Sequence, residues 1–576
     1  MSLTTIAPEQ GAVSARPRRN ERVAQLAVLL APVVFIAMMG WHRRYLDDDA
    51  FFNFRVIDQI WAGHGPVFNA GQRVEMTTST LWLLFLVVGH AILPFVRLEY
   101  LALAGGLVLT CLGVWWAQRG AGLLWRRSSA ALLVPLGTMV YVAIPASWDR
   151  ATSGLENGLS IAWLGLAMLL LGKEVSRPPS TGTAWLVGAL LGLGPLVRPD
   201  LGLMALSAVA AVCWMRRERR SDLARLVVGF LALPAVVELF RMGYYGVLVP
   251  NTAIAKDSGS LYFDRGWRYL TDFVTPYLLW IPVVIAVAAC IIAFRQSSTR
   301  RTIPALLALP VGAVLHLAYI TATGGDYLHG RLLHTTLFAL LAPIAVIPWR
   351  LRTAAPWILA AAWALTAALA LRPTLIGTKI SPRTSPYVLD GRQLMRNATK
   401  PGRQPILATD FAFKGGLLAK RLAAEHKHAY VTITAPKPLL GATRGRTQML
   451  AGGAGVNGYL AGPNVIVQEW HGLADVVTSR FPAWENTLAG HRKGQEPEWF
   501  VALATKPRVT SGLDASAVAA ARHALRCGAI REIQEATQQP LTIGRFFDNV
   551  TGSIGRTSLA IPRGPKAAMR KFCDTP

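Results

Sequence analysis

Three carboxylates stand next to one another early in the chain, at Asp47, Asp48 and Asp49, directly after an apolar segment. Like charges this close raise at least one pKa, and partial burial at an apolar boundary raises it further. Such a cluster needs a cation, a basic partner or a shared proton. It suits a catalytic site in which one carboxylate acts as a general base or nucleophile. The plain alternative is a hydrated acidic cluster beside Arg43 and Arg44.

Polar side chains that suit a sugar follow the acids. Glu75 and the hydroxyls of Thr77, Thr78 and Ser79 stand just before an apolar block that begins near residue 80. We expect them to bind the sugar or the acceptor; alternatively, the hydroxyls cap the next helix. Between the acids and the hydroxyls, apolar residues of the segment 51–61 recur at helical spacing, which predicts a helix lying along the membrane surface.

Cations that suit a phosphate occur in later loops. Arg198 and Arg331 offer a bidentate fork, and Lys256 offers a point charge that neutralises a leaving phosphate. His329 would give this phosphate a proton or a hydrogen bond, although a simple interfacial histidine is the alternative.

Three further polar residues, Glu156, Asn251 and Asp326, interrupt the apolar sequence on what we expect to be the same side. We interpret them as sugar or acceptor ligands. Ionisable residues near a membrane are rare unless they line a cavity, pair or react, so their convergence suggests a polar cleft. Each of them taken alone is equally an ordinary loop residue.

No Walker A loop, HExxH motif or CxxC pair occurs, and we expect no dinucleotide-binding fingerprint. Nucleotide hydrolysis and zinc chemistry therefore have no support, so the energy for a reaction must arrive with the substrate. We predict no metal ligands and no definite cofactor. A divalent cation beside the acids is the one cofactor that the sequence leaves open.

Composition places these residues in a membrane protein. Of the 576 residues, 52% are hydrophobic and 16% are charged, whereas soluble domains carry about 25% charged residues. The net charge of +27 suits either nucleic acid or basic loops beside membrane spans, and the long apolar blocks favour the second. We therefore expect membrane lipids, and no nucleic acid, as partners.

Apolar blocks predict a polytopic α-helical membrane protein with about twelve candidate spans. They lie near residues 23–41, 80–96, 98–118, 130–146, 159–172, 183–197, 201–215, 224–240, 273–294, 303–322, 332–348 and 355–371. The basic N-terminus, 1–22, and basic connections at 216–220, 295–301 and 349–352 fall at alternate loops, which places them in the cytoplasm. A C-terminal part outside then requires an odd number of crossings. We predict about eleven spans, with 80–96 or 98–118 re-entrant or interfacial.

After this membrane domain, 23–371, which includes a first external loop at 42–79, the sequence changes character. Short β-type runs at 404–409, 429–434, 464–468 and 499–505 alternate with helical patterns such as 514–526, which we expect to end at Gly528. We predict a soluble α/β domain over residues 372–576, outside the membrane. Cys527 and Cys573 lie in this domain, where a disulfide is permitted, although two cysteines set no geometry.

Several motifs carry a resemblance to a known family. The sequence RYLDDD at 44–49, with GHGPVFN at 63–69 and VEMTTSTLW at 74–82, resembles the AftB family of terminal β-(1→2) arabinofuranosyltransferases of mycobacterial and corynebacterial cell walls. So do GGDYLHGR at 324–331, GLAD at 472–475 and GH at 490–491. The likeness covers nearly the whole chain in order, and its first run is the most specific.

The resemblance implies a GT-C glycosyltransferase, a multi-pass enzyme of the plasma membrane with its active site on the external face. It implies decaprenyl-phospho-arabinofuranose as donor and the arabinan ends of arabinogalactan and lipoarabinomannan as acceptor. The family's acidic pair falls on Asp48 and Asp49, which favours Asp48 as the essential carboxylate and makes Asp47 an additional acid. Glu469 and His471 replace the Asp and Tyr of the family's pattern, which favours a structural or acceptor-contact role there.

The resemblance also constrains the mechanism, because a β donor that gives a β linkage keeps its configuration. A covalent intermediate on an Asp and a front-face route both satisfy this, and the sequence does not choose between them. Other functions compete: a related transferase that moves mannose from a polyprenyl phosphate, a transporter of a lipid-linked sugar, and a non-catalytic envelope scaffold. A transporter would show related halves, which we do not find.

Overall fold

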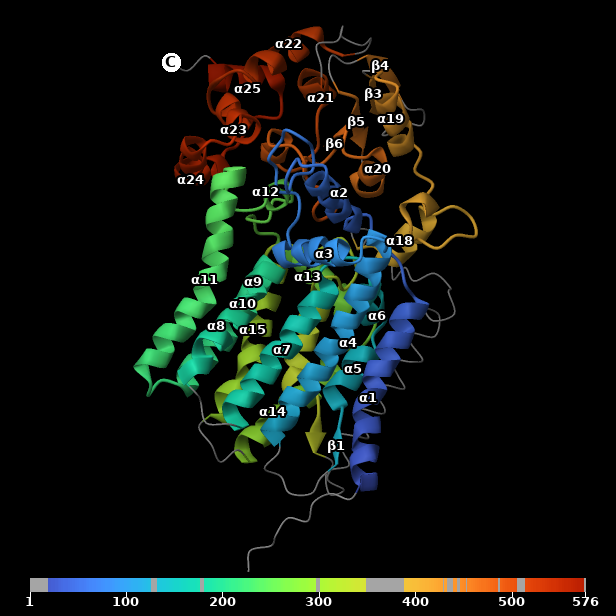
Figure 1. Ribbon diagram of the computed structural model, residues 1–576. Helices are drawn as coiled ribbons and strands as arrows, with labels where there is room; N and C mark the ends of the chain where they lie inside the picture. Colours follow the sequence, from blue (N-terminus) through green and yellow to red (C-terminus); the bar gives the residue numbers. More distant parts are fainter. Residues whose placement is uncertain are drawn as a thin grey trace, which may run out of the picture.

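The computed structural model describes residues 19–125, 132–176, 181–296, 301–348, 388–427, 429–432, 439–442, 446–451, 453–484, 487–504 and 513–573. In these residues the chain forms a long helical bundle below and a mixed layer of helices and a small sheet above it (Figure 1). The predicted span at 355–371, the predicted boundary at 371/372 and most of the basic N-terminus lie outside the described residues.

Among the described residues, the bundle contains five helices that are long and apolar enough to cross a membrane. They are α1 (Arg19–His42), α4 (Leu98–Trp125), α7 (Asn157–Ser176), α11 (Arg220–Tyr245) and α15 (Thr302–Ala322). Shorter helices complete it: α5 (Leu136–Val142), α6 (Pro145–Thr152), α8 (Ala184–Leu191), α9 (Gly194–Val197), α10 (Gly202–Met215), α13 (Phe263–Val274), α14 (Trp280–Gln296) and α16 (Leu333–Leu341). An antiparallel pair, β1 (Leu133–Val134) and β2 (Ile347–Pro348), lies near its lower end.

Helices α4 and α7 pack backbone to backbone through glycines. The glycines recur at every seventh residue on both helices: Gly106, Gly113 and Gly120 on α4, and Gly158, Gly165 and Gly172 on α7. A Cβ at Gly113 would overlap the carbonyl of Ile161, and a Cβ at Gly165 would overlap the carbonyl of Gly113. Small residues let membrane helices approach this closely, and the gain is van der Waals contact.

The doubtful pair of predicted spans forms one short and one long helix. Helix α3 (Thr80–Ile92) has 13 residues. At a rise of about 1.5 Å per residue it is too short for a hydrocarbon core of roughly 30 Å. It lies across the upper ends of the bundle helices (Figure 1). Its outer side exposes Leu84, Val88 and Ile92, so α3 is the helix that suits the membrane surface.

The prediction of a surface helix at 51–61 is wrong. Helix α2 (Ala50–Trp61) is buried along most of its length, with Phe51, Phe54 and Ile57 fully enclosed. The Arg55 guanidinium, also fully buried, donates hydrogen bonds to the carbonyls of Phe68, Gly458, Gly462 and Val465 at 2.6–2.9 Å. Residues far along the chain therefore cover the face of α2 that the sequence pattern assigns to water.

The upper layer contains a four-stranded sheet in the order β4-β3-β5-β6. The strands are β3 (Ala429–Thr432), β4 (Leu439–Ala442), β5 (Gln448–Ala451) and β6 (Ile466–Glu469). Strand β3 pairs antiparallel with β4 and parallel with β5, which pairs parallel with β6. The helices are α12 (Asn251–Ala255), α18 (Gly391–Asn397), α19 (Gly415–Ala424), α20 (Ala454–Ala461), α21 (Pro497–Ala504), α22 (Ala515–Ala524), α23 (Gly528–Gln538), α24 (Ile543–Ser558) and α25 (Pro565–Cys573).

Two of the four predicted strands of this layer are confirmed. Strand β3 lies within the predicted segment 429–434, and β6 overlaps the predicted segment 464–468. The segment 404–409 instead forms turns that lead into a 3₁₀ turn at Ala408–Asp410. Residues 499–504 of the predicted strand 499–505 lie in helix α21, and residue 505 lies outside the described residues. Pro497 and Glu498 begin this helix with the residue types that a first helical turn favours.

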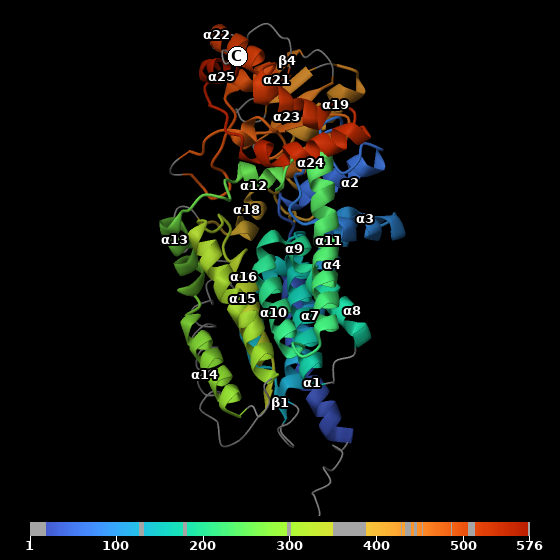
Figure 2. The same cartoon turned by 90° about the vertical axis from the view of Figure 1, so that its left-hand side faces the viewer.

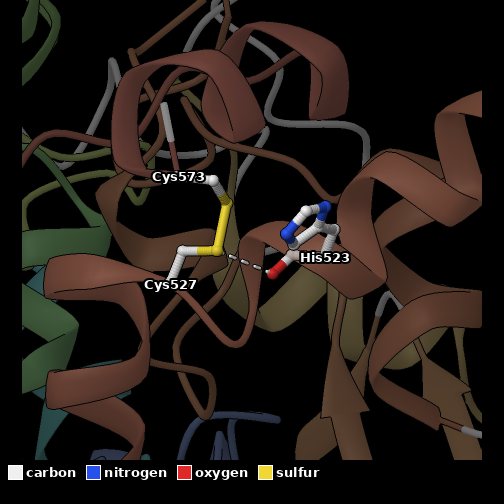
Figure 3. Close-up of side chains that lie close together, drawn as sticks. All are labelled: His523, Cys527 and Cys573. Carbon is white, nitrogen blue, oxygen red and sulfur yellow. Dashed lines mark hydrogen bonds between the residues drawn. A yellow bond between two sulfur atoms is a disulfide. The ribbon is translucent and has the colours of Figure 1, made fainter. Parts of the chain in front are cut away.

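The C-terminal helices confirm the predicted helix at 514–526 and the permitted disulfide. Asp514 caps α22 by accepting hydrogen bonds from the backbone N–H groups of Ser516 and Ala517. Gly528 does not end this helix but begins α23, with a φ of 44°. Cys527 and Cys573 form the disulfide, with Cα atoms 5.2 Å apart, and tie α25 to the start of α23 (Figure 3). Because these sulfurs bond each other, the nearby His523 has no thiolate partner for a metal.

We predict that Gly165→Ala destabilises the bundle, because the new methyl group meets the α4 backbone. Overpacking of this kind costs about 1–3 kcal/mol. The measurement is the thermal unfolding midpoint of the full chain in detergent. Gly555→Ala is the control, since a Cβ there meets no atom within 4 Å and alanine favours the helix. Equal midpoints for the two variants would contradict the role of the glycine contact.

Candidate active site

The three acids lie in the turn between α1 and α2, and each has a different partner. Asp47 is buried, and its Oδ1 accepts a hydrogen bond from the Asp49 backbone N–H at 3.3 Å. Its Oδ2 lies 3.9 Å from the Arg150 guanidinium. Burial, together with the charge of Asp49, raises the pKa of Asp47 to about 6 despite the nearby Arg331 and Arg150.

Asp48 reaches upward to the start of α20. Its two carboxylate oxygens accept hydrogen bonds from the backbone N–H groups of Gly455, at 3.1 Å, and Val456, at 2.8 Å. A helix N-terminus favours such an anion, because its first N–H groups are unpaired and carry partial positive charge. Burial nevertheless outweighs these bonds and raises the pKa of Asp48 to about 7.

The sequence interpretation missed this contact, although a signal was present. Residues 453–458 read GAGVNG, which is the GxGxxG pattern of a dinucleotide-binding loop, and they follow β5 and open α20 as that pattern requires. The expectation that no such fingerprint occurs is therefore wrong. Here the Asp48 carboxylate occupies the helix start where a phosphate would bind. A Cβ at Gly455 would overlap the Asp48 carbonyl oxygen, so only glycine fits.

Asp49 faces the cations. Its Oδ2 accepts a hydrogen bond from Nη1 of Arg331 at 3.1 Å, while Nε of Arg331 lies 3.5 Å from Asp326. Burial would raise the pKa of Asp49, but the charges of Lys256 and Arg331 outweigh it and hold the pKa below its usual value. Asp49 is thus the ionised member of the cluster.

A cavity of about 220 Å³ adjoins this ion pair, between the bundle and the upper layer. Its cations are Arg198, Lys256, Arg265, Arg331 and Arg492, and its carboxylates are Glu156, Asp200 and Asp326. We call it the cationic cavity, because five cations outnumber three carboxylates. It brings together three of the four predicted phosphate ligands.

These cations differ in how they are held. Arg198 binds Glu156 at 2.8 Å and Asp200 at 3.0 Å, so its fork is already occupied. The side-chain ammonium of Lys256 makes no hydrogen bond, and no ion pair within 4 Å, with any residue in the described ranges, although its charge lowers the pKa of Asp49. Its half-buried ammonium is therefore the cation that is free for an anionic ligand.

The fourth predicted phosphate ligand, His329, lies elsewhere. Its Nδ1 is 2.6 Å from Oδ2 of Asp272 and its Nε2 is 2.8 Å from the hydroxyl of Tyr277. It lines a second cavity of about 200 Å³ with Arg43, Asp149 and other residues, and it does not line the cationic cavity. Grouping His329 with Arg331 was wrong, because the two side chains leave the same loop in different directions.

The predicted sugar ligands near residue 75 separate in the structure. Glu75 forms a two-point ion pair with Arg241, at 2.6 and 3.2 Å, and is buried. Ser79 caps α3 by accepting a hydrogen bond from the Trp82 N–H, as the capping alternative predicts. Thr77 is buried, and Thr78 lines the cationic cavity. Of these residues only Thr78 is placed to meet a ligand there.

Asn251 is a structural residue rather than a free sugar ligand. Its amide donates to the carbonyls of Gly472 and Leu473 at 3.0 and 2.9 Å and accepts from the Ser479 hydroxyl. Glu469 fixes the same turn by accepting from the N–H groups of His471 and Leu473. These hydrogen bonds fit the structural role that the sequence analysis gave as one alternative for Glu469 and His471. Glu156 and Asp326, in contrast, do line the cationic cavity.

Comparison with known proteins identifies close relatives. Residues 415–570 match the family described as the AftB family C-terminal domain. The chain is 31% identical to a terminal β-(1→2)-arabinofuranosyltransferase of Mycobacterium tuberculosis, over 95% of this chain and 96% of the relative. It is also 31% identical to the protein of the same name from Corynebacterium glutamicum, over 96% of this chain and 88% of the relative. No solved structure matches the chain.

The raised pKa of Asp48, from 3.8 to about 7, predicts a pH-dependent stability. Between pH 4 and pH 7, Asp48 of the folded chain holds a proton that the same residue releases in the unfolded chain. Its contribution to the free energy of unfolding is therefore fully present at low pH and is lost as the pH rises to about 7. We expect the unfolding midpoint of wild type to fall more than that of Asp48→Asn over this range. Asp548→Asn, at an exposed site, should follow wild type. Parallel curves for wild type and Asp48→Asn would contradict the assignment.

Proposed function

Since this chain belongs to the family of terminal β-(1→2)-arabinofuranosyltransferases, and so is a membrane glycosyltransferase, we propose its donor and acceptor. The chain transfers arabinofuranose from decaprenyl-phospho-arabinofuranose to the non-reducing ends of cell-wall arabinan, in arabinogalactan and lipoarabinomannan. The observation that carries the proposal is the Asp49–Arg331 ion pair at the edge of a cavity with an unpaired Lys256. Because the chain belongs to a glycosyltransferase family, we favour this function over those of a transporter or a non-catalytic scaffold.

The cationic cavity supports a phosphate-bearing donor. A phosphate at this site would gain charge-assisted hydrogen bonds from Lys256 and from Arg331. It would also compete with Asp49 for Arg331, so that the ionised Asp49 carboxylate beside the sugar would lose its bond to Arg331. Donor binding would therefore leave the Asp49 carboxylate available to the sugar. The same cations would stabilise the negative charge of the phosphate as it leaves.

The acidic cluster supports retention of configuration. Asp49 adjoins the phosphate cations, so its carboxylate is the one placed to face the anomeric carbon, either as nucleophile or as stabiliser of the developing positive charge. Asp48, which the family resemblance favours as essential, is held by α20 and keeps the turn in place. Both acids therefore belong to the proposed site, with Asp47 behind them.

The orientation in the membrane follows from charge. The exposed Arg217 and Arg219 lie just before α11, at the lower end of the bundle, and the other end of α11 contacts the upper layer (Figure 1). Helix α1 begins at the same lower end. The positive-inside rule places this lower end in the cytoplasm. We therefore propose a plasma-membrane protein with about eleven spans, whose cationic cavity and residues 372–576 lie on the external face.

The direct test incubates purified chain with polyprenyl-phospho-arabinofuranose and a short α-(1→5) arabinan, followed by linkage analysis. We expect terminal β-(1→2) arabinofuranose, and a loss of about 10²–10⁴-fold in turnover for Asp49→Asn and for Asp48→Asn. Thermal unfolding of both variants separates lost chemistry from lost packing. Product with another sugar donor, such as the mannosyl analogue, at equal rate would overturn the assigned specificity.

Lys256→Met tests the phosphate site without breaking an internal ion pair. The expected result is a rise of about tenfold in the KM for the donor, because a hydrogen bond to a charged group contributes about 1.5–3 kcal/mol. The acceptor KM should stay unchanged. Arg217→Met, at the far end of the bundle, is the matched control. An unchanged donor KM in Lys256→Met would count against this cavity as the phosphate site.

A further inference from the structure

Helix α24 has its apolar side facing outward. Ile543, Phe547 and Ile554 are 81%, 61% and 66% exposed, and their spacing places them on one face of the helix. The opposite face, which is buried, carries the polar residues Asn549 and Ser553. A helix at a water-exposed surface has the reverse arrangement, so the outward face of α24 requires an apolar environment.

Polar contacts fix α24 in this orientation on the C-terminal end of α11. The Asn549 amide donates to the Gly243 carbonyl at 2.9 Å, and the Phe546 ring packs where a side chain at Gly243 would lie. Arg556, on the same buried side, binds Glu532 at 2.6 Å. Rotating the helix to bury Ile554 would break these bonds, so the outward apolar face is built into the fold.

The height of α24 matches the edge of the lipid. A hydrocarbon core of roughly 30 Å needs about 20 residues of helix. Counted from the exposed Arg225 on α11, this length ends near Tyr245, the last residue of α11. Val236 and Leu239, 63% and 50% exposed, continue the apolar surface of α11 up to that level. Helix α24 crosses the upper end of α11 at this height (Figure 2).

We infer that α24 is a membrane-surface helix, whose outward side chains Ile543, Phe547 and Ile554 insert into the lipid boundary. The occupant of this face is lipid because the face continues the exposed apolar surface of α11, a helix that crosses the membrane. This contact anchors the upper layer at a second place besides α3, and holds the cationic cavity at the level of a lipid-borne substrate. It does not depend on which sugar is transferred.

The test measures the depth of nitroxide labels in the full-length chain. Single cysteines replace Ile543, Phe547 or Ile554 in a background where Cys111, Cys213 and Cys290 are serine, and the Cys527–Cys573 disulfide is kept. The protein is placed in vesicles of phosphatidylethanolamine and phosphatidylglycerol. Collision of each label with oxygen, which concentrates in lipid, is compared with collision with a water-soluble nickel chelate. Val236→Cys supplies the lipid reference and Ala519→Cys, on an exposed position of α22, the water reference.

We expect the three α24 labels to collide with oxygen and to be shielded from nickel, as at Val236. Nickel accessibility equal to that at Ala519 would overturn the inference. Shielding from both reagents would also overturn it, because it would show that protein, such as a second copy of the chain, covers this face. Transfer activity of each labelled variant confirms that the chain is folded, and the depth readout is independent of the donor assigned above.

Discussion

The contact between Asp48 and the start of α20 joins two parts of the chain about 400 residues apart, and the site depends on it. A carboxylate fills a helix N-terminus whose loop has the GxGxxG pattern of a phosphate site. The chain thus places a carboxyl group of its own where related loops place a ligand. This contact fixes the turn that carries all three acids, and it brings the upper layer down onto the bundle.

Three adjacent carboxylates persist because each one is neutralised differently. Asp48 has helix N–H groups, Asp49 has Arg331, and Asp47 has the more distant Arg150. A single shared cation would leave two charges in competition, whereas separate partners let Asp49 stay ionised beside neighbours whose pKa is raised. The arrangement keeps one ionised carboxylate, Asp49, paired with Arg331 next to the cationic cavity.

Much of this site could be predicted from residue type, and the remainder could not, for a physical reason. The expectation that Arg198, Lys256 and Arg331 lie together near the acids rests on the need of charges near a membrane for partners, and the structure brings these side chains to one cavity. Glu75 was assigned to a sugar, yet its partner Arg241 lies 166 residues away, which no local pattern reveals. His329 shows the same limit, because His329 and Arg331, two residues apart, line different cavities. Residue type and spacing predict which side chains need a polar or charged partner, but the identity of that partner depends on tertiary packing.

The fold shows that limit again in its amphipathic helices. An apolar stripe on a helix predicts that this face of the helix is shielded from water, but it does not indicate whether lipid or protein shields it. Protein covers the apolar stripe of α2. The fully buried Arg55 shows this, because its guanidinium donates hydrogen bonds to four backbone carbonyls. No lipid surface offers such acceptors to a cation at that depth. Helix α3 has no lysine or arginine along its length, and its apolar residues Leu84, Val88 and Ile92 are exposed. In α2, the buried arginine with its carbonyl partners therefore shows that protein covers the face that carries it.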